Sequence, residues 1–340
     1  MRRPAGAIGL AAVGIVGVAL LVGLPLVVET FTLVDVTVFV ILSTLALSLA
    51  LVWGFGGILC FGQSAFFGLG GYAYALGVLN MGESTVPILF GILLPMLFAA
   101  LLGYFMFWGR VSDVYLAVIT LTVSLIFFHL MNSTSGPEYR LGSAPLGGAN
   151  GIPGVPPINV PGDPGDQLGF DDMYRLAMAV LLVTYFGLRA LLASHFGRVV
   201  VSIRENELRA ELLGYDARRY KLAVFVIGAG IAGLAGVLFT NWGSFIGPTV
   251  FSIVFTAQII IWLMVGGLGT LGGAILGTVI IQFLTTWLGE AKIADTNLVL
   301  GIIFVLFVLL VPSGLQPKVQ DLARAFAARL SGARAGRDAR

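Results

Sequence analysis

The longest stretch without a charged residue limits what this chain can fold into. From Leu222 to Gly289, 68 consecutive residues include no Asp, Glu, Lys or Arg. At about 20 residues for each crossing of a bilayer, this stretch is long enough for three transmembrane helices. A soluble protein of 340 residues, 58% of them hydrophobic and with a mean hydropathy of +0.99, could not keep so much apolar surface out of water. The sequence therefore predicts an all-α, polytopic integral membrane protein.

Ten apolar windows are candidates for membrane spans. The third and ninth are rich in glycine and are compatible with broken or re-entrant segments, so we expect eight to ten transmembrane helices. The first window follows a basic N-terminus, but its apolar run is too long for a signal peptide and no A-x-A cleavage pattern follows, so we interpret it as a retained span. The windows cover about Gly6–Val28, Leu33–Trp53, Gly56–Leu79, Val86–Trp108, Val114–Met131, Met173–Ala193, Leu222–Thr240, Val250–Gly267, Leu271–Gly289 and Leu298–Val311.

Lysine and arginine residues are distributed unevenly between the two sides of these windows. With ten spans and a cytoplasmic N-terminus, 16 of the 19 basic residues lie at the cytoplasmic face, and only Arg140, Arg175 and Lys292 lie outside. Cytoplasmic loops of membrane proteins carry an excess of basic residues. We therefore expect both termini in the cytoplasm, a transmembrane domain over residues 1–315 and a basic cytoplasmic tail over residues 316–340.

Two longer polar segments connect the windows. Residues 132–172 hold seven of the 14 prolines and nine glycines, a composition that excludes a regular helix and predicts an extended extracytoplasmic loop. Residues 194–220 are charged and form the predicted main cytoplasmic loop.

The residue types at membrane depth argue against several functions. His129 is the one ionisable residue near that depth, which weakens an ion-coupled transporter without excluding a secondary transporter or a channel. GAGIAG, Gly228 to Gly233, fits a dinucleotide-binding pattern, but it lies inside an apolar span and no acid follows before Glu290. Cys60 is the single cysteine, which excludes a cysteine-based metal site. We predict no catalytic residue, metal, cofactor or nucleic-acid partner, and a membrane-embedded enzyme is the least favoured class.

Glycines at regular spacing predict close contact between helices. Gly269, Gly273 and Gly277 form a G-x-x-x-G-x-x-x-G pattern, which would line three glycines along one helix face. Gly228 and Gly233 are interpreted in the same way. In lipid, small residues favour helix association because they let two backbones approach closely.

The most polar part of the cytoplasmic loop is SIRENELRAELLG, residues 202–214. Ser202 and Glu205 fit a capping box for a helix of about three turns that starts near Ile203. Glu205 and Arg209 are spaced to pair across one turn, and Gly214 suits the position after the helix end. Positive residues alone would be typical of any cytoplasmic loop. The added acids and the apolar stripe favour docking into a groove of a partner protein.

Several segments, in order, resemble the permeases of branched-chain amino acid ABC importers, of the LivH/LivM type and closer to LivM. They are GILCFGQSAFFGLGGYAYA, VYLAVITLTVSLIFFHLMNSTSGPE, GGANGIPGV, RENELRAELLGYDARRYKLAVFVIGAGIAGLAG, IIIWLMVGGLGTLGGAILG and VPSGL. The resemblance extends from about Leu45 to Leu315.

The resemblance implies a transport subunit in the plasma membrane that does not itself hydrolyse ATP. The implied partners are two cytoplasmic ATP-binding subunits, a second homologous permease and an extracytoplasmic substrate-binding protein. ATP binding and hydrolysis in the partners would drive alternating access. The residues that the resemblance assigns to ATPase coupling are Arg204, Glu205, Asn206, Glu207, Arg209, Ala210, Glu211 and Gly214.

The substrate class is less closely defined. Amino-acid members of the family often have His after the glycine of the early motif, whereas here Gly62 is followed by Gln63, which resembles urea and short-chain amide importers. Branched-chain or other hydrophobic amino acids are our first expectation, and urea or amides the alternative. Residues expected near the translocation path, or else in interhelical hydrogen bonds, are Gln63, Ser64, Phe67, Thr120, Thr122 and Gln258.

Overall fold

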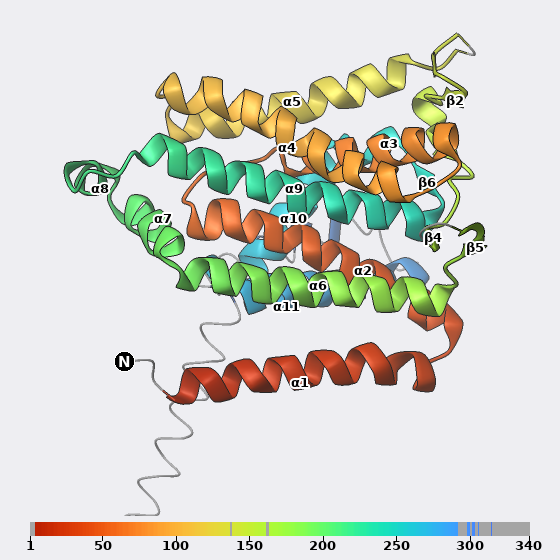
Figure 1. Ribbon diagram of the computed structural model, residues 1–340, viewed down its shortest axis with the longest axis horizontal. Helices are drawn as coiled ribbons and strands as arrows, with labels where there is room; N and C mark the ends of the chain where they lie inside the picture. Colours follow the sequence, from red (N-terminus) through yellow and green to blue (C-terminus); the bar gives the residue numbers. More distant parts are fainter. Residues whose placement is uncertain are drawn as a thin grey trace, which may run out of the picture.

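The computed structural model describes residues 4–136, 138–160 and 163–291, with a few single positions beyond them. Its long helices lie side by side along the longest axis of the molecule (Figure 1). The α-helices are α1 (Pro4–Val27), α2 (Thr30–Leu49), α3 (Gln63–Met81), α4 (Thr85–Trp108), α5 (Asp113–Ser133), α6 (Phe170–Ala193), α7 (His195–Glu205), α8 (Glu207–Leu212), α9 (Ala217–Gly243), α10 (Ile253–Gly266) and α11 (Leu271–Ala291).

Among the described residues, six helices are long and apolar enough to cross a membrane: α2 with its continuation to Phe55, α4, α5, α6, α9 and α11. Shorter apolar helices cover Val13–Val27 and Ile253–Gly266, and α3 occupies most of the third predicted window. The prediction of an all-α polytopic membrane protein is therefore confirmed. The tenth window lies mostly outside the described residues, and Lys292 and the predicted tail over 316–340 lie entirely outside them.

The third window, for which we expected a broken or re-entrant segment, is helical only from Gln63, where α3 begins. Residues 50–55 instead extend α2 as a π-helix, η1 (Ala50–Phe55), and the chain then runs without helical structure to Gly62. Gly57 has a φ of +70°, a backbone conformation that interrupts a right-handed helix. Non-helical backbone within a membrane protein is tolerated where it is buried in protein, and Gly56, Ile58, Cys60 and Gly62 are all buried.

Helix α9 lies at the centre of the bundle and packs against α2, α3 and α4. Glycines permit these close approaches: a Cβ at Gly70 would collide with the backbone of Gly233, and a Cβ at Gly236 with the carbonyl of Phe67. A Cβ at Gly233 would in turn collide with the carbonyl of Gly91 on α4. These backbone contacts take the place of the hydrophobic driving force that lipid does not supply.

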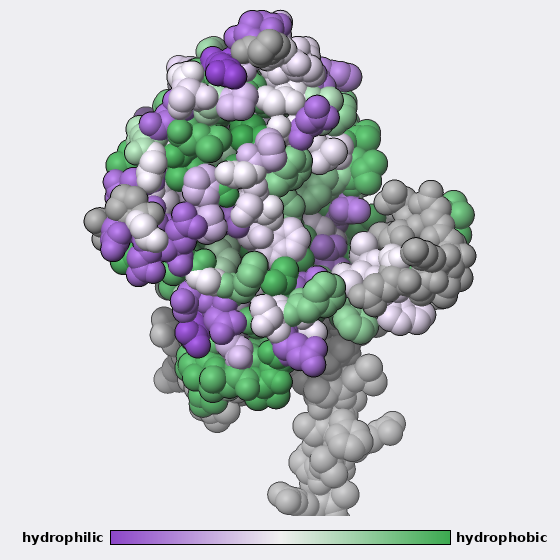
Figure 2. All heavy atoms as spheres, turned by 90° about the vertical axis from the view of Figure 1, so that its right-hand side faces the viewer, coloured by the Kyte–Doolittle hydropathy of each residue, from purple (hydrophilic) through white to green (hydrophobic). Residues whose placement is uncertain are grey.

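The segment between α5 and α6 is non-helical except for one 3₁₀ turn, η2 (Gly148–Asn150). Short antiparallel pairs organise it: β1 (Arg140–Leu141) with β2 (Ala144–Pro145), and β4 (Asn159–Val160) with β5 (Asp163–Gln167). A third pair joins β3 (Ile152–Pro153) to β6 (Phe245–Ile246), beyond the end of α9, and η3 (Pro248–Phe251) follows β6. Figure 2 looks onto this end of the molecule and shows hydrophilic side chains spread across it.

Helices α7 and α8 lie at the opposite end of the bundle (Figure 1, green, left). The two polar segments identified in the sequence therefore lie at opposite ends of the apolar helices. We refer below to the α8 end and the β-pair end.

Candidate functional site

The polar segment at the α8 end forms two short helices rather than the single predicted one. Helix α7 begins after Ser194, whose hydroxyl accepts a hydrogen bond from the Gly197 backbone N–H, and continues to Glu205. Ser202 is thus inside α7, and the predicted capping box is wrong. The true N-cap of α8 is Asn206, whose Oδ1 accepts from the Arg209 backbone N–H at 2.9 Å. With its own cap α8 has only six residues, fewer than the three turns expected.

The expected pair between Glu205 and Arg209 is also wrong. Glu205 pairs with its neighbour Arg204, and Arg204 donates a second hydrogen bond to the Gly54 carbonyl. Gly214 follows α8 with a φ of +91°, the left-handed region expected for a residue after a helix end.

Helix α8 is held by one buried face. Ala210 is fully buried in a small cluster with Val199, Ile203 and Ala217, and Tyr215 and Tyr220 pack against this cluster. The rest of α8 is exposed and combines charged side chains with leucines. Leu208, Leu212 and Leu213 are 67%, 81% and 68% exposed. Leu208 and Leu212 of α8, together with its C-cap residue Leu213, therefore leave three large apolar side chains exposed at this end of the molecule.

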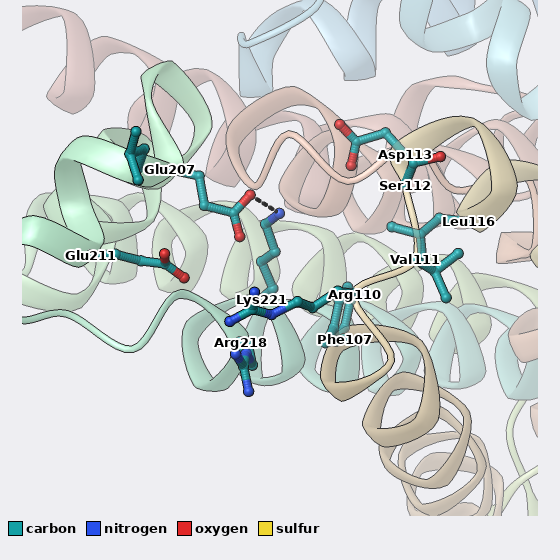
Figure 3. Close-up of a pocket in the computed structure, with 11 residues that line it drawn as sticks. Phe107, Arg110, Val111, Ser112, Asp113, Leu116, Glu207, Glu211, Arg218 and Lys221 are labelled. Carbon is teal, nitrogen blue, oxygen red and sulfur yellow. Dashed lines mark hydrogen bonds and ion pairs between the residues drawn. The ribbon is translucent and has the colours of Figure 1, made fainter.

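A groove of about 440 Å³ separates α8 from the turn between α4 and α5 (Figure 3). Its basic side chains are Arg110, Arg218 and Lys221, and its acidic side chains are Asp113, Glu207 and Glu211. Lys221 Nζ donates to Glu207 Oε2 at 2.6 Å, which ties the first turn of α9 to α8. The other lining residues are Phe107, Val111, Ser112, Leu116 and Leu208. The groove combines charge of both signs with apolar walls.

The structure places the predicted coupling residues in three different positions. Arg204 and Glu205 end α7, and Asn206 is the joint between the two helices. Glu207, Arg209, Ala210 and Glu211 belong to α8, and Gly214 follows it. Arg110, in the turn between α4 and α5, and Asp113, the first residue of α5, were missed. Nothing in the sequence places this turn beside α8, because the contact joins segments about 100 residues apart.

A second polar group lies inside the bundle, where α2, α3, α5 and α10 meet. Ser64 Oγ hydrogen-bonds Ser124 Oγ at 3.0 Å and Thr256 Oγ1 at 2.7 Å. Nearby, Thr120 Oγ1 accepts from the Phe61 backbone N–H at 3.0 Å, and Ser48 Oγ donates to Gln63 Oε1 at 3.4 Å. All of these hydroxyl and amide side chains are buried. We call the three residues Ser64, Ser124 and Thr256 the hydroxyl triad.

The hydroxyl triad unites one predicted path residue with two that were missed. Ser64 had been predicted, whereas Ser124 and Thr256 had not, although Thr120 and Ser124 are spaced by one helical turn and therefore share a face of α5. Gln63 is next to Ser64 in the chain, and Thr120 lies one helical turn before Ser124. Their own hydrogen bonds are to Ser48 and to the Phe61 backbone N–H.

The other predicted path residues lie elsewhere. Phe67 packs between the rings of Phe239 and Phe255, each at a centroid distance of 5.3 Å. Thr122 is exposed and donates only to the Val118 carbonyl of its own helix. Gln258 is half-buried on α10. These three residues do not join the hydrogen-bonded group.

Three buried polar atoms have no hydrogen-bond partner among the described residues: Gln63 Nε2, Tyr72 Oη and Trp262 Nε1. Buried polar groups without partners are rare in folded proteins, and a functional role is one of the explanations for them. Among the residues that the structure describes, no three His, Cys, Asp or Glu side chains come close enough to hold a metal ion.

The predicted row of glycines on one helix face needs a correction at Gly269. That residue lies in the turn between α10 and α11, with a φ of +80°, and not in a helix. Gly273 and Gly277 are in α11 and face α10: a Cβ at Gly277 would lie 2.6 Å from the Gly266 backbone nitrogen, and a Cβ at Gly266 would collide with the Gly273 carbonyl. A Cβ at Gly228 would collide with the side chain of Val52 in η1, and a Cβ at Gly233 would collide with the Gly91 carbonyl in α4.

Comparisons with known proteins agree with this architecture. The family model described as "Branched-chain amino acid transport system / permease component" matches residues 32–311. The high-affinity branched-chain amino acid transport system permease protein LivM of Escherichia coli K12 is 28% identical over 330 residues, covering 88% of this chain and 73% of that protein. The Salmonella typhimurium LivM is 28% identical over 311 residues, covering 83% and 69%.

A more distant relative is a probable branched-chain amino acid transport permease protein LivM of Methanocaldococcus jannaschii, 27% identical over 243 residues and covering 65% of each chain. No solved structure matches significantly. The family match spans most of the chain, including α2 to α11, the hydroxyl triad and the α7–α8 segment. The chain therefore belongs to the family of permease components of branched-chain amino acid transport systems.

Proposed function

We propose that this chain is the membrane-spanning subunit of an ABC importer in the plasma (inner) membrane, which moves branched-chain or related hydrophobic amino acids by alternating access. The observation that carries the proposal is α8. It is a separately capped helix with two exposed leucines and a third at its C-cap, placed outside the apolar body at one end of the bundle. An exposed apolar face on a helix outside the membrane is typical of a surface that a partner protein covers.

The proposed partners are two cytoplasmic ATP-binding subunits, a second homologous permease and an extracytoplasmic binding protein. The orientation follows from the basic residues: Arg198, Arg209, Arg218, Arg219 and Lys221 all lie at the α8 end, which we place in the cytoplasm. The β-pair end is then extracytoplasmic and faces the binding protein.

We propose that the ATPase contacts both α8 and the groove beside it. The exposed leucines would supply apolar burial, and the mixed charges of the groove would fix the orientation of the partner, because charge complementarity mainly gives specificity. The docking surface would thus include Arg110 of the α4–α5 turn and Asp113 of α5 in addition to α8.

The hydroxyl triad and its neighbours Gln63 and Thr120 are the proposed polar lining of the translocation path. They lie where α3, α5 and α10 meet, and their side chains can exchange hydrogen bonds among themselves or with a substrate. Gln63, the residue at which the sequence resembles urea importers, is buried, and its Oε1 accepts a hydrogen bond from Ser48 Oγ. Equilibrium binding of leucine, isoleucine, valine and urea to the partner binding protein would separate the two substrate classes.

Co-expression with the genes that neighbour this one tests the assembly. We expect the ATP-binding subunits to co-purify with the wild-type chain. The double variant Glu207→Lys/Glu211→Lys should lose them while inserting normally into the membrane, because both changes reverse charges in the docking groove. Asp171→Lys/Asp172→Lys, at the β-pair end, is the matched control and should retain the ATPase. An intact wild-type chain that recruits no ATPase would refute the proposed function.

A further inference from the structure

The side chain of Arg204 connects the α7–α8 segment to the transmembrane body. Its Nη1 donates to the Gly54 carbonyl at 2.5 Å, and its Nη2 pairs with Glu205. Although Arg204 ends α7 in a polar segment, its side chain is only 34% exposed. The guanidinium group is thus directed toward α2 rather than toward the exposed leucines of α8.

The carbonyl that Arg204 binds belongs to an unusual helix end. Gly54 is in the π-helix η1, which continues α2. The backbone N–H groups that follow donate to other carbonyls, Gly56 to Leu51, Gly57 to Trp53 and Ile58 to Val52. No backbone N–H of the described residues after η1 donates to Gly54, so Arg204 satisfies an otherwise unpaired carbonyl at the helix end. Single-turn π-helices often mark functional positions.

Glycines let the backbone approach Arg204 from two sides. Gly57 has a φ of +70°, and a Cβ there would lie 2.6 Å from Arg204 Cγ. Gly269, in the turn between α10 and α11, has a φ of +80°, and a Cβ there would lie 3.5 Å from Arg204 Nη1. A Cβ at Gly54 would lie 3.0 Å from the Gly269 backbone nitrogen. Three segments therefore meet at one guanidinium: the end of α7, the end of η1 and the α10–α11 turn.

These segments connect to the proposed translocation path. Helix α2 carries Ser48, which donates to Gln63, and α10 carries Thr256 of the hydroxyl triad. At the other side, α7 continues through the cap at Asn206 into α8. A displacement of α8 would thus reach both α2 and the α10–α11 turn through Arg204.

We propose that Arg204 is a positioning residue that transmits motion of α8 to α2 and to the α10–α11 turn, and that it does not contact the ATPase. The inference rests on the proposed function. Arginine suits this role because its planar group donates in two fixed directions at once, here to Gly54 and to Glu205. The role differs from the one the family resemblance implies, in which Arg204 is part of the ATPase contact.

The test uses the complete importer in proteoliposomes, with its binding protein, and measures three quantities: ATPase co-purification, ATP hydrolysis and leucine taken up per ATP hydrolysed. Arg204→Gln should keep wild-type co-purification and membrane insertion, with only a small fall in thermal stability from the Gly54 carbonyl that loses its donor. Its uptake per ATP should fall about tenfold, the effect expected when a charged hydrogen bond to a buried carbonyl is lost. Arg204→Lys, which keeps the charge but not the planar fork, should give an intermediate ratio.

Arg198→Gln is the matched control. Arg198 is on the same helix and donates only to the Ala193 carbonyl of the preceding turn, so uptake per ATP should match the wild type. Weakened co-purification of Arg204→Gln, with a normal ratio in the complexes that remain, would make Arg204 a docking residue and overturn the inference. A wild-type ratio in Arg204→Gln or in folded Arg204→Lys would also overturn it. Failure of the proposed function would look different, because the wild-type chain itself would then bring down no ATPase.

Discussion

The leucines of α8 allow a quantitative prediction about ATPase docking. Leu212 is 81% exposed. Leu212→Ala removes three carbon atoms, and each buried methylene contributes about 0.8 kcal/mol. If the ATPase buries the part of this side chain that is now exposed, docking should weaken by about 2 kcal/mol, or about 30-fold in the dissociation constant.

The assay is a titration of the purified permease in detergent with fluorescently labelled ATP-binding subunit. The matched control is Leu141→Ala, since Leu141 is 60% exposed but lies in β1 at the β-pair end, where no ATPase is expected. Neither change should alter the thermal stability of the permease, because neither side chain is buried in it. A dissociation constant for Leu212→Ala within about twofold of wild type would refute the reasoning that α8 docks through its apolar face.

Three further predictions concern the fold and the path. Gly70→Ala should abolish a monodisperse gel-filtration peak, because the new methyl collides with the Gly233 backbone, whereas Gly187→Ala, with nothing within 4 Å, should behave as wild type. Ser64→Ala should lower the free energy of unfolding by about 1–2 kcal/mol, because it leaves the buried hydroxyls of Ser124 and Thr256 short of a partner, and it should also reduce uptake. Thr122→Val should change neither quantity. Asn206→Ala should weaken ATPase docking by about 1 kcal/mol in the same titration, since α8 loses its N-cap.

The long transmembrane helices could be predicted from the sequence because the length of an apolar run sets the length of a span. Helix α4 begins one residue before its predicted window and ends at the same residue, Trp108. Helix α6 begins three residues early and ends at Ala193 as expected. Composition also predicted the irregular loop before α6, since proline and glycine exclude a regular helix there.

The errors occurred where contacts distant in sequence decide the local conformation. At residues 56–62, for example, Gly57 packs against Arg204, about 150 residues away in the chain, and the exact bounds of the break could not be read from the local sequence. Similarly, Ser202 has the pattern of an N-cap, but the helix that began at Ser194 continues through it. The sequence around Ser202 does not show that the helix has already begun at an earlier N-cap, Ser194.

The candidate sites were predicted only in part for the same reason. The sequence predicted that residues 204–214 dock into a partner, because mixed charge with apolar residues is recognisable locally, and this contact stays a prediction. The hydroxyl triad brings together three helices, and only Ser64 was singled out beforehand, as a polar residue in apolar surroundings. The groove next to α8 likewise needs the α4–α5 turn, which carries no distinctive pattern of its own.

Site-directed cross-linking at Leu208 tests the central claim most directly. The single native cysteine, Cys60, is buried, so a cysteine introduced by Leu208→Cys can be labelled selectively with a photoreactive maleimide in the assembled importer. We predict a covalent adduct between this position and the ATP-binding subunit, and none with that subunit from Leu141→Cys. An adduct from Leu141→Cys but not from Leu208→Cys would contradict the assignment of α8 as the ATPase-docking helix.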